Sequence, residues 1–394
     1  MPSAAIYLDH NATTPIDPRV VEAMRRAWER WPGNPASQHD AGRKARRMLE
    51  EAREGIASLL GAKTTGMDAD QLIFTSGGTE ANNLALLGLL PLAGTKPGPG
   101  MEQPDAPRLI ISAIEHPSIA GAATELRRRG CAVEHVSVSP DGIVDVRGLG
   151  GSDPGLVSVM LANNETGVIQ PVADIVTFFH ERKAIVHTDA VQAVGKIPVN
   201  FRELGVDALT VAPHKFHGPL GIGALILRHG TKLQPQLHGG FQQAGLRPGT
   251  ESVALAVGFF EALRLAQEEA ADRQSRMRSL RDELERLLLQ ELPDIVIIGQ
   301  RAPRLPNTSC IAFPGLSRQA LAMSLDLAGV ACSTGSACAS GSSEPSPTLL
   351  AMGLPKPLVE SAIRFSIGAF TAATDIAEAA RRIINCVNHL RERK

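Results

Sequence analysis

Short apolar runs alternate with amphipathic segments through the middle of this 394-residue chain, and that alternation limits its possible folds most strongly. The apolar runs are typical of strands and the amphipathic segments of helices. Strands that alternate with helices form a largely parallel sheet with helices on both faces, so the pattern predicts an α/β fold. Strands are predicted over residues 71–74, 108–113, 156–161, 184–187, 208–211 and 222–227, and helices over 79–90, 117–129 and 172–182.

The pattern changes near residue 252. Residues 252–292 contain almost no Pro or Gly and many charge pairs spaced four residues apart, which predicts long helices with one break near Asp272. Shorter apolar runs and two helical stretches follow, so a smaller α+β domain is expected after the parallel sheet. The predicted elements are residues 294–298, 308–313, 317–327, 330–332, 362–367 and 373–390, with a loop rich in Ser, Gly and Pro over 333–347.

Composition excludes several classes of protein. With 43% apolar and 21% charged residues the chain is of ordinary globular composition. Its 40 basic and 41 acidic residues give a net charge of −1, which does not support sequence-independent binding of nucleic acid. No apolar run reaches the roughly 18 residues that a membrane span requires. The first 15 residues lack the features of a secretory signal, so a cytoplasmic location is expected.

The chain has five cysteines, at positions 131, 310, 332, 338 and 386, which is a sparse and odd number, whereas a disulfide scaffold is short, rich in cysteine and usually even in count. Reduced thiols are therefore expected, most of them packed as small apolar residues. No metal site is expected either, because the chain has no H-E-x-x-H motif and no paired C-x-x-C motifs.

Polar groups follow the predicted strands, at the positions where ligands of parallel sheets bind. Each group alone has an ordinary structural explanation: a glycine-rich turn can cap a helix, a histidine can be satisfied in the core, and paired asparagines often form a turn. Lys215 between two histidines is harder to explain in this way, because clustered cations require a nearby anion or a loss of charge. The groups are TSGGTE (75–80), EHP (115–117), NNETG (163–167), HTDAVQ (187–192) and APHKFHGP (212–219).

Together these groups fit the chemistry of pyridoxal phosphate. This cofactor needs a lysine for its Schiff base and an acid beside its pyridinium nitrogen, which Lys215 and Asp189 could supply. The glycine-rich turn at residues 75–79 opens a predicted helix and could hold the phosphate. His116 could lie against the ring.

With these groups the chain resembles the cysteine desulfurases. These enzymes depend on pyridoxal phosphate, have the fold called fold-type I and are related to the class V aminotransferases. The resemblance extends along nearly the whole chain, and the two C-terminal motifs are its most specific part. The motifs are YLDHNATTP (7–15), GNPAS (33–37), FTSGGTE (74–80), EH (115–116), NNETG (163–167), HK (214–215), RPGT (247–250), STGSAC (333–338) and IRFS (363–366).

The resemblance implies a role for each matching residue. Lys215 would carry the cofactor, Asp189 would hold its ring nitrogen protonated, His116 would stack on the ring and handle protons, and Cys338 would take the substrate sulfur as a persulfide. Arg364 and Asn34 would bind the substrate, with the arginine fork on its carboxylate. The other implied cofactor contacts are Gln192 and Asn164 at the phenolic oxygen, and Gly78, Thr79, His214 and a partner subunit's copy of Thr250 at the phosphate.

The same resemblance implies a large cofactor domain over residues 14–262 and a small domain formed by residues 1–13 and 263–394. The small domain would carry Cys338 on a mobile loop near residues 333–347. A homodimer, the substrate L-cysteine and a sulfur-accepting protein such as an iron–sulfur scaffold are also implied. Two alternatives remain open: another class V enzyme, such as an aminotransferase or a selenocysteine lyase, and a non-catalytic scaffold for iron–sulfur assembly.

One position departs from the family pattern. Ser-Gly commonly precedes His-Lys in the family, whereas this chain has Ala212 and Pro213. Alanine has no hydroxyl donor and proline has no N–H. One phosphate contact is therefore in doubt, at a cost of about 1–3 kcal/mol if nothing replaces it.

Overall fold

The computed structural model describes residues 5–30, 33–90, 106–146, 154–335 and 344–392. Its strands are β1 (Ile6–Tyr7), β2 (Gln71–Thr75), β3 (Arg108–Ser112), β4 (Ala132–Val136), β5 (Leu156–Ser158), β6 (Ile185–Asp189), β7 (Ala208–Val211), β8 (Gly223–Leu227), β9 (Val296–Ile298), β10 (Thr308–Ala312), β11 (Val330–Ala331) and β12 (Ala362–Ser366). Its helices are α1 (Pro18–Arg30), α2 (Asp40–Leu59), α3 (Gly78–Leu89), α4 (Pro117–Arg128), α5 (Val172–His180), α6 (Phe201–Leu204), α7 (Val253–Glu268), α8 (Ala270–Glu291), α9 (Arg318–Leu327), α10 (Pro347–Ala351), α11 (Lys356–Val359) and α12 (Ala373–Glu392).

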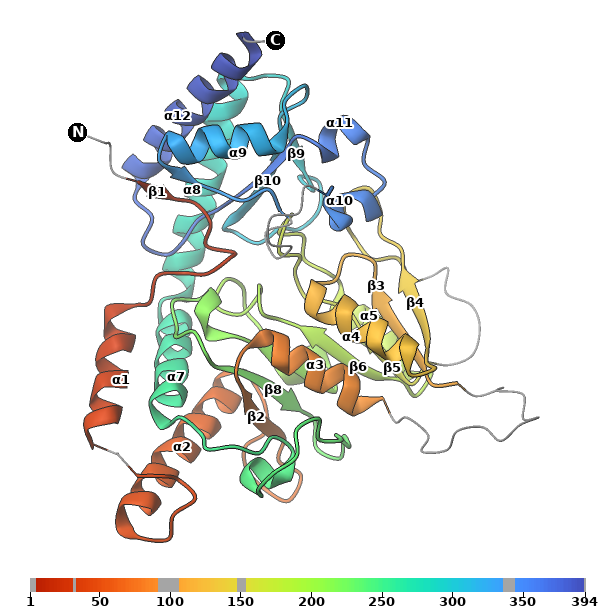
Figure 1. The fold of residues 1–394 in the computed structure, drawn as a ribbon, viewed down its shortest axis with the longest axis vertical. Helices are drawn as coiled ribbons and strands as arrows, with labels where there is room; N and C mark the ends of the chain where they lie inside the picture. Colours follow the sequence, from red (N-terminus) through yellow and green to blue (C-terminus); the bar gives the residue numbers. More distant parts are fainter. Residues whose placement is uncertain (1–4, 31–32, 91–105, 147–153, 336–343, 393–394) are drawn as a thin grey trace.

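A seven-stranded sheet in the order β2-β8-β7-β6-β5-β3-β4 forms the larger part of the molecule (Figure 1). Strand β8 runs antiparallel to both of its neighbours, β2 and β7. The remaining pairs are parallel, so every strand except β8 points the same way. The predicted, mainly parallel sheet is confirmed, and the carboxyl ends of β2, β3, β5, β6 and β7 lie along one edge.

Alternating side chains of the strands enter two separate cores, one on each face of this sheet. In β8, Ala224 and Ile226 belong to the core that includes α2, α5 and α7, whereas Leu225 and Leu227 belong to the core under α3 and α4. This alternation is the two-residue period of a strand buried on both faces. The sheet edge that carries the polar groups is thereby held rigidly.

A second unit is built on a three-stranded antiparallel sheet, β12-β10-β9, and a parallel pair, β1-β11. Its core contains side chains of α8, α9 and α12, together with Ile6 and Leu8 from the N-terminal segment. The chain enters this unit where α7 ends and α8 begins, at Glu269, close to the break expected near Asp272. The domain boundary predicted between residues 262 and 263 falls within α7, and the division into two domains stays a prediction.

Seven of the described elements lie outside the predicted set: the helices α1, α2, α6, α10 and α11, and the strands β1 and β4. Helix α2 buries a narrow stripe that includes Ala45, Leu49 and Ala52, and charged residues between them weaken the apolar period. Strand β4 is the last strand at one edge of the sheet, and most of its residues are at least partly exposed. A strand of that kind has no apolar run by which to recognise it.

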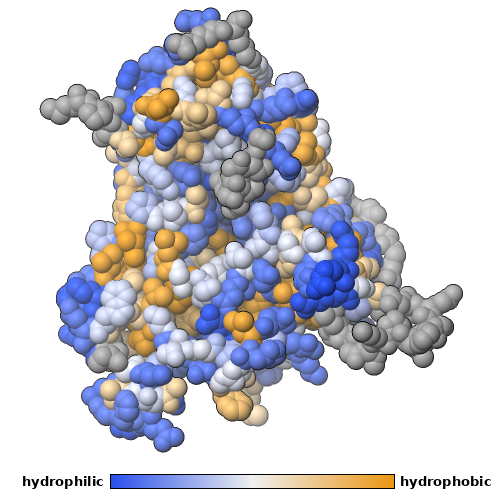
Figure 2. Space-filling view, viewed as in Figure 1, coloured by the Kyte–Doolittle hydropathy of each residue, from blue (hydrophilic) through white to orange (hydrophobic). Residues whose placement is uncertain are grey.

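Among the described helices, none combines the length and the apolar character that a bilayer crossing needs. Figure 2 shows hydrophilic and hydrophobic residues intermixed over the face seen in Figure 1.

Candidate active site

A cavity of about 300 Å³ lies at the carboxyl edge of the large sheet, in the size range of small-molecule sites. Predicted site residues from five loops and one strand of the second unit line it together. They are Gly78, Thr79, His116, Asn164, Asp189, Gln192, His214, Lys215 and Arg364. Asn11, Asn82, Ser118 and Gly335 also line the cavity and were not predicted as site residues.

Asp189, the last residue of β6, is 7% exposed, and both of its carboxylate oxygens are held. Oδ1 accepts a hydrogen bond from the backbone N–H of Val191 at 2.9 Å, and Oδ2 accepts one from Asn82 Nδ2 at 2.6 Å. Asn82 also donates to Ser118 Oγ at 2.9 Å. The carboxylate is therefore fixed in orientation at the cavity wall.

Lys215 ends a short 3₁₀ turn, Pro213–Lys215, that follows β7. Its Nζ donates to the backbone carbonyls of Asn11 and Ala12, both at 2.7 Å. The N-terminal segment therefore crosses from the second unit and holds the amine at the edge of the sheet.

The predicted phosphate cradle is the N-terminus of α3. The N–H groups of the first helical turn have no intrahelical partners and attract an anion. A Cβ at Gly78 would approach Val191 Cγ2 to 3.1 Å and Ala212 Cβ to 3.6 Å, so the backbone, Val191 and Ala212 are closely packed. The Ala212 methyl, which stands where the family has a hydroxyl, lies directly beside this helix start.

His116 has a structural role as well as a place in the cavity wall. It is the N-cap of α4, and its Nδ1 accepts a hydrogen bond from the backbone N–H of Ser118 at 3.2 Å. This capping bond fixes the ring against the cavity.

His214 lies on the Lys215 side of the cavity. Burial, followed by the nearby Lys215 and Lys196, lowers the pKa of His214 to about 4. Its Nδ1 lies 3.2 Å from Thr13 Oγ1. The ring is therefore neutral at physiological pH and reaches the cavity as a hydrogen-bonding group.

Arg364 lies in the middle of β12 and is 3% exposed. Nη2 contacts Asp9 Oδ1 at 2.6 Å, and Nη1 donates to the backbone carbonyl of Asn164 at 2.9 Å. Nε is buried without a hydrogen-bond partner among the described residues. The guanidinium thus has a structural carboxylate beside it, and Arg364 also forms part of the cavity wall.

Two further predicted residues, Asn34 and Thr250, do not line this cavity. Asn34 and Thr250 are both exposed on this chain, and the side chain of Asn34 accepts a hydrogen bond from the backbone N–H of Ala36 at 2.9 Å. Cys338 lies outside the described residues. The roles predicted for these three residues stay predictions.

The described residues on either side of Cys338 both contact Glu165. Gly335 lines the cavity with a φ of +86°, and a Cβ there would lie 2.4 Å from Glu165 Oε2. On the other side, Ser346 Oγ donates to the same carboxylate oxygen at 2.6 Å. Burial raises the pKa of Glu165. Gly335 therefore packs closely against the same carboxyl group to which Ser346 is hydrogen-bonded.

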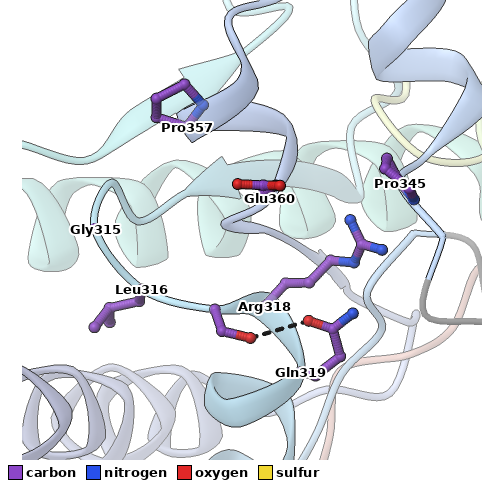
Figure 3. Close-up of a pocket in the computed structure, with 8 residues that line it drawn as sticks. Gly315, Leu316, Arg318, Gln319, Pro345, Pro357 and Glu360 are labelled. Carbon is purple, nitrogen blue, oxygen red and sulfur yellow. Dashed lines mark hydrogen bonds between the residues drawn. The ribbon is translucent and has the colours of Figure 1, made fainter.

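A second cavity, of about 480 Å³, lies at the start of α9 (Figure 3). Arg318 and Glu360 line it, and the Ser317 hydroxyl donates to Gln319 Oε1 at 3.0 Å. It contains none of the predicted site residues.

Among the residues with described positions, no group of three or more His, Cys, Asp or Glu side chains is arranged to hold a metal ion.

The first cavity fits pyridoxal phosphate on its own geometry. An amine and a carboxylate face it from adjacent strands, a helix N-terminus opens onto it, and an imidazole forms part of its wall. Asn82 Oδ1 is buried there without a hydrogen-bond partner among the described residues, so the protein leaves one polar atom of this wall unsatisfied. Lys215, Asp189, His116 and the start of α3 would hold the cofactor.

Known proteins resemble this chain in sequence and in fold. Residues 6–378 match the aminotransferase class V family. A cysteine desulfurase of Enterobacter agglomerans is 41% identical over 98% of this chain and 93% of its own length. A NifS-like protein from Rickettsia africae has a TM-score of 0.84 at 32% identity, covering 98% of this chain and 99% of that one. A structure named SspA in complex with cysteine has a TM-score of 0.76 at 27% identity, covering 93% and 100% of the two chains. The chain belongs to the class V aminotransferase family, among its cysteine desulfurases.

Proposed function

We propose that this protein is a cysteine desulfurase that converts L-cysteine to L-alanine and carries the removed sulfur on Cys338. The observation that carries the proposal is the meeting of Lys215, Asp189 and Arg364 in one cavity, with Gly335 in its wall three residues before Cys338. The relatives named cysteine desulfurase and the structural neighbour in complex with cysteine support this choice of substrate.

Four residues of the chain have separate roles in the proposed reaction. When bound, pyridoxal phosphate supplies an electron sink for the bonds at the substrate's α-carbon. Asp189 keeps a negative charge beside the ring nitrogen, and Lys215 supplies the amine that anchors the cofactor and can move a proton at the α-carbon. Arg364 fixes the substrate carboxylate, and the Cys338 thiolate attacks the substrate sulfur, since the thiolate is the nucleophilic form.

The transfer of sulfur from L-cysteine to Cys338 needs no external oxidant. The sulfur leaves L-cysteine, which gains a proton at its β-carbon and becomes L-alanine, and Cys338 becomes a persulfide. A thiol reductant then releases sulfide and restores the thiol.

The direct test is to incubate the purified protein with L-cysteine and a thiol reductant and to measure sulfide and alanine together. Equal amounts of the two products are expected. An aminotransferase would form pyruvate-type keto acids from amino acids instead, and a selenocysteine lyase would turn over selenocysteine in strong preference to cysteine. A scaffold would form neither product.

Replacing Arg364 by lysine should raise KM for cysteine about tenfold or more while the cofactor's visible absorbance is kept. Lysine is a point charge and cannot form the two parallel hydrogen bonds of the planar guanidinium. Steady-state kinetics of the yellow variant measure the effect. Because Asp9 contacts the same guanidinium, Asp9→Asn is the matched control for loss of the structural ion pair. An unchanged KM in Arg364→Lys would assign the arginine to structure alone.

We further propose a homodimer with active sites at the interface, in which Thr250 reaches the partner's phosphate. Thr250 is exposed and lies outside the cavity of its own chain, as a residue that serves another subunit must. Two-fold symmetry makes such an exchange reciprocal. Light scattering should give the mass of two chains, and Thr250→Ala should weaken cofactor binding without splitting the dimer. A fully active monomer would contradict the shared site.

The sulfur acceptor, proposed to be a protein such as an iron–sulfur scaffold, and the cytoplasmic location stay predictions.

A further inference from the structure

A second lysine, Lys196, is buried behind Lys215 and has no role in the function proposed above. Its side chain is 3% exposed. Its Nζ donates to Gln192 Oε1 at 2.7 Å and to Asn11 Oδ1 at 3.2 Å, and both of these acceptors are neutral amide oxygens. The charged groups that act on it are Lys215 and Arg364, which are also cations. Burial and these two cations lower the pKa of Lys196 well below its usual value.

The two acceptors of Lys196 form a closed ring of hydrogen bonds with it. Gln192 Nε2 donates to the backbone carbonyl of Asn11 at 2.9 Å, and the same carbonyl accepts from Lys215 Nζ at 2.7 Å. Because Oε1 of Gln192 faces Lys196, its NH₂ group must face Asn11. The hydrogen bond from Lys196 therefore fixes the orientation of the Gln192 side-chain amide.

The ring continues to the substrate side of the cavity through Asn11. Asn11 Nδ2 donates to Thr308 Oγ1 at 2.9 Å and to the backbone carbonyl of Asn164 at 3.2 Å. That Asn164 carbonyl also accepts from Arg364 Nη1 at 2.9 Å. Lys196 is thus connected by continuous hydrogen bonds to the groups proposed to hold the cofactor and the substrate carboxylate.

Packing alone does not explain an amine at this position. An apolar side chain could fill the space, whereas a buried amine is costly unless its hydrogen bonds are used. In a buried polar network each member depends on its partners, so loss of one donor loosens the others.

We propose that Lys196 is a positioning residue of the cofactor site: it fixes the orientation of Gln192 and Asn11, and through them the position of Lys215. The inference rests on the proposed cofactor role of Lys215. Lys196 touches neither cofactor nor substrate in this arrangement, so its effect should appear in kcat and in the cofactor's spectrum more than in KM.

The titration of the site can report on Lys196 without using activity. The groups that face it are Lys215, Arg364 and three histidines. Burial is the main cause that lowers the pKa of His10 to about 3 and those of His214 and His217 to about 4, so these rings stay neutral between pH 6 and pH 10. Gln192 is proposed to donate to the cofactor's phenolic oxygen, and such a donor favours loss of the proton at the Lys215 nitrogen. Without Lys196 the Gln192 amide can turn away, so the midpoint of the cofactor's visible titration should rise.

The experiment compares the wild-type holoenzyme with Lys196→Met, Lys196→Gln and the surface control Lys44→Met. We expect Lys196→Met to keep the cofactor, to raise the spectral midpoint by about 0.5–1 pH unit and to lower kcat about tenfold, with KM within about twofold. Lys196→Gln keeps an N–H donor that can reach Gln192 Oε1, so its midpoint should rise by less and much of kcat should be recovered. Lys44→Met should match the wild type.

A wild-type midpoint in both Lys196 variants would overturn the inference, whether or not their melting temperature falls. If Lys196→Met does not fold, Lys196→Gln alone decides: a raised midpoint supports the inference and an unchanged one overturns it. Failure of the proposed function would look different, because the wild-type protein would then show no visible band with pyridoxal phosphate.

Discussion

Replacing Lys215 by alanine should abolish desulfurase activity, with a loss on the order of a thousandfold or more in kcat. The side chain ends at the carboxyl edge of β7, and its amine is held by two backbone carbonyls at 2.7 Å. Lys215 is the only lysine among the described residues that line the cavity, and the buried Lys196 is not one of them. The purified wild-type protein should be yellow, and the alanine variant should lose the covalently held cofactor.

Borohydride treatment provides the matching chemical measurement. In the wild type it should fix the cofactor to the peptide that contains Lys215, which mass spectrometry of a digest identifies. Lys44→Ala, on the exposed surface of α2, is the control and should retain colour, labelling and activity. A wild-type protein that stays colourless with added pyridoxal phosphate, or a label on a different lysine, would refute the assignment of Lys215.

Much of the large sheet was predictable because its strands are buried on both faces. Such strands appear as continuous apolar runs, and the polar groups that follow them then fall at one edge. Lys215, Asp189 and His116 were therefore accessible from the sequence by their positions after strands. The reversed direction of β8 left this argument intact, because β8 contributes none of the residues concerned.

Residues that act from a distance were not predictable in this way. Asn11 comes from the N-terminal segment, far in sequence from Lys215, and only the crossing of the chain between the two units brings them together. Asn82 gave a weak signal, as a polar residue on an otherwise apolar face of α3. Lys196 gave none, since a lysine seven residues after a strand is normally exposed.

The sequence leaves two explanations for Arg364, an ion pair within the protein and a bond to the substrate carboxylate, and the structure was needed to examine them. A charged residue within an apolar run has to meet an anion, but the run does not say which anion. The structure provides Asp9 as a permanent partner and leaves the guanidinium in the cavity wall. The ion pair with Asp9 is therefore observed, and the substrate-binding role stays a prediction in which Asp9 would orient the guanidinium.

Replacing Cys338 by serine should leave the cofactor bound and release almost no sulfide, a loss on the order of a hundredfold or more in turnover. A serine hydroxyl cannot accept sulfur as a persulfide. Replacing Cys332 by alanine should leave the protein largely active. The small expected effect at Cys332 follows from the surroundings of its thiol. Cys332 packs against the core of the second unit, and burial followed by the nearby Asp9 raises the pKa of its thiol to about 12. A thiol with so high a pKa is protonated at physiological pH and a poor nucleophile.

The two variants should be compared in sulfide release and in persulfide content after a single turnover. Both should show the wild-type visible band, because neither variant removes a residue that is proposed to hold the cofactor. Wild type and Cys332→Ala should gain a mass of one sulfur atom on the peptide that contains Cys338. Cys338→Ser should gain none, although cysteine should still change its spectrum, since Arg364 and Lys215 are intact. If Cys332→Ala lost the sulfur and Cys338→Ser kept it, the carrier would be misassigned, while the cofactor site would stand. The geometry favours Cys338, because Gly335, three residues before it, lies in the cavity wall against Glu165, which also accepts a hydrogen bond from Ser346.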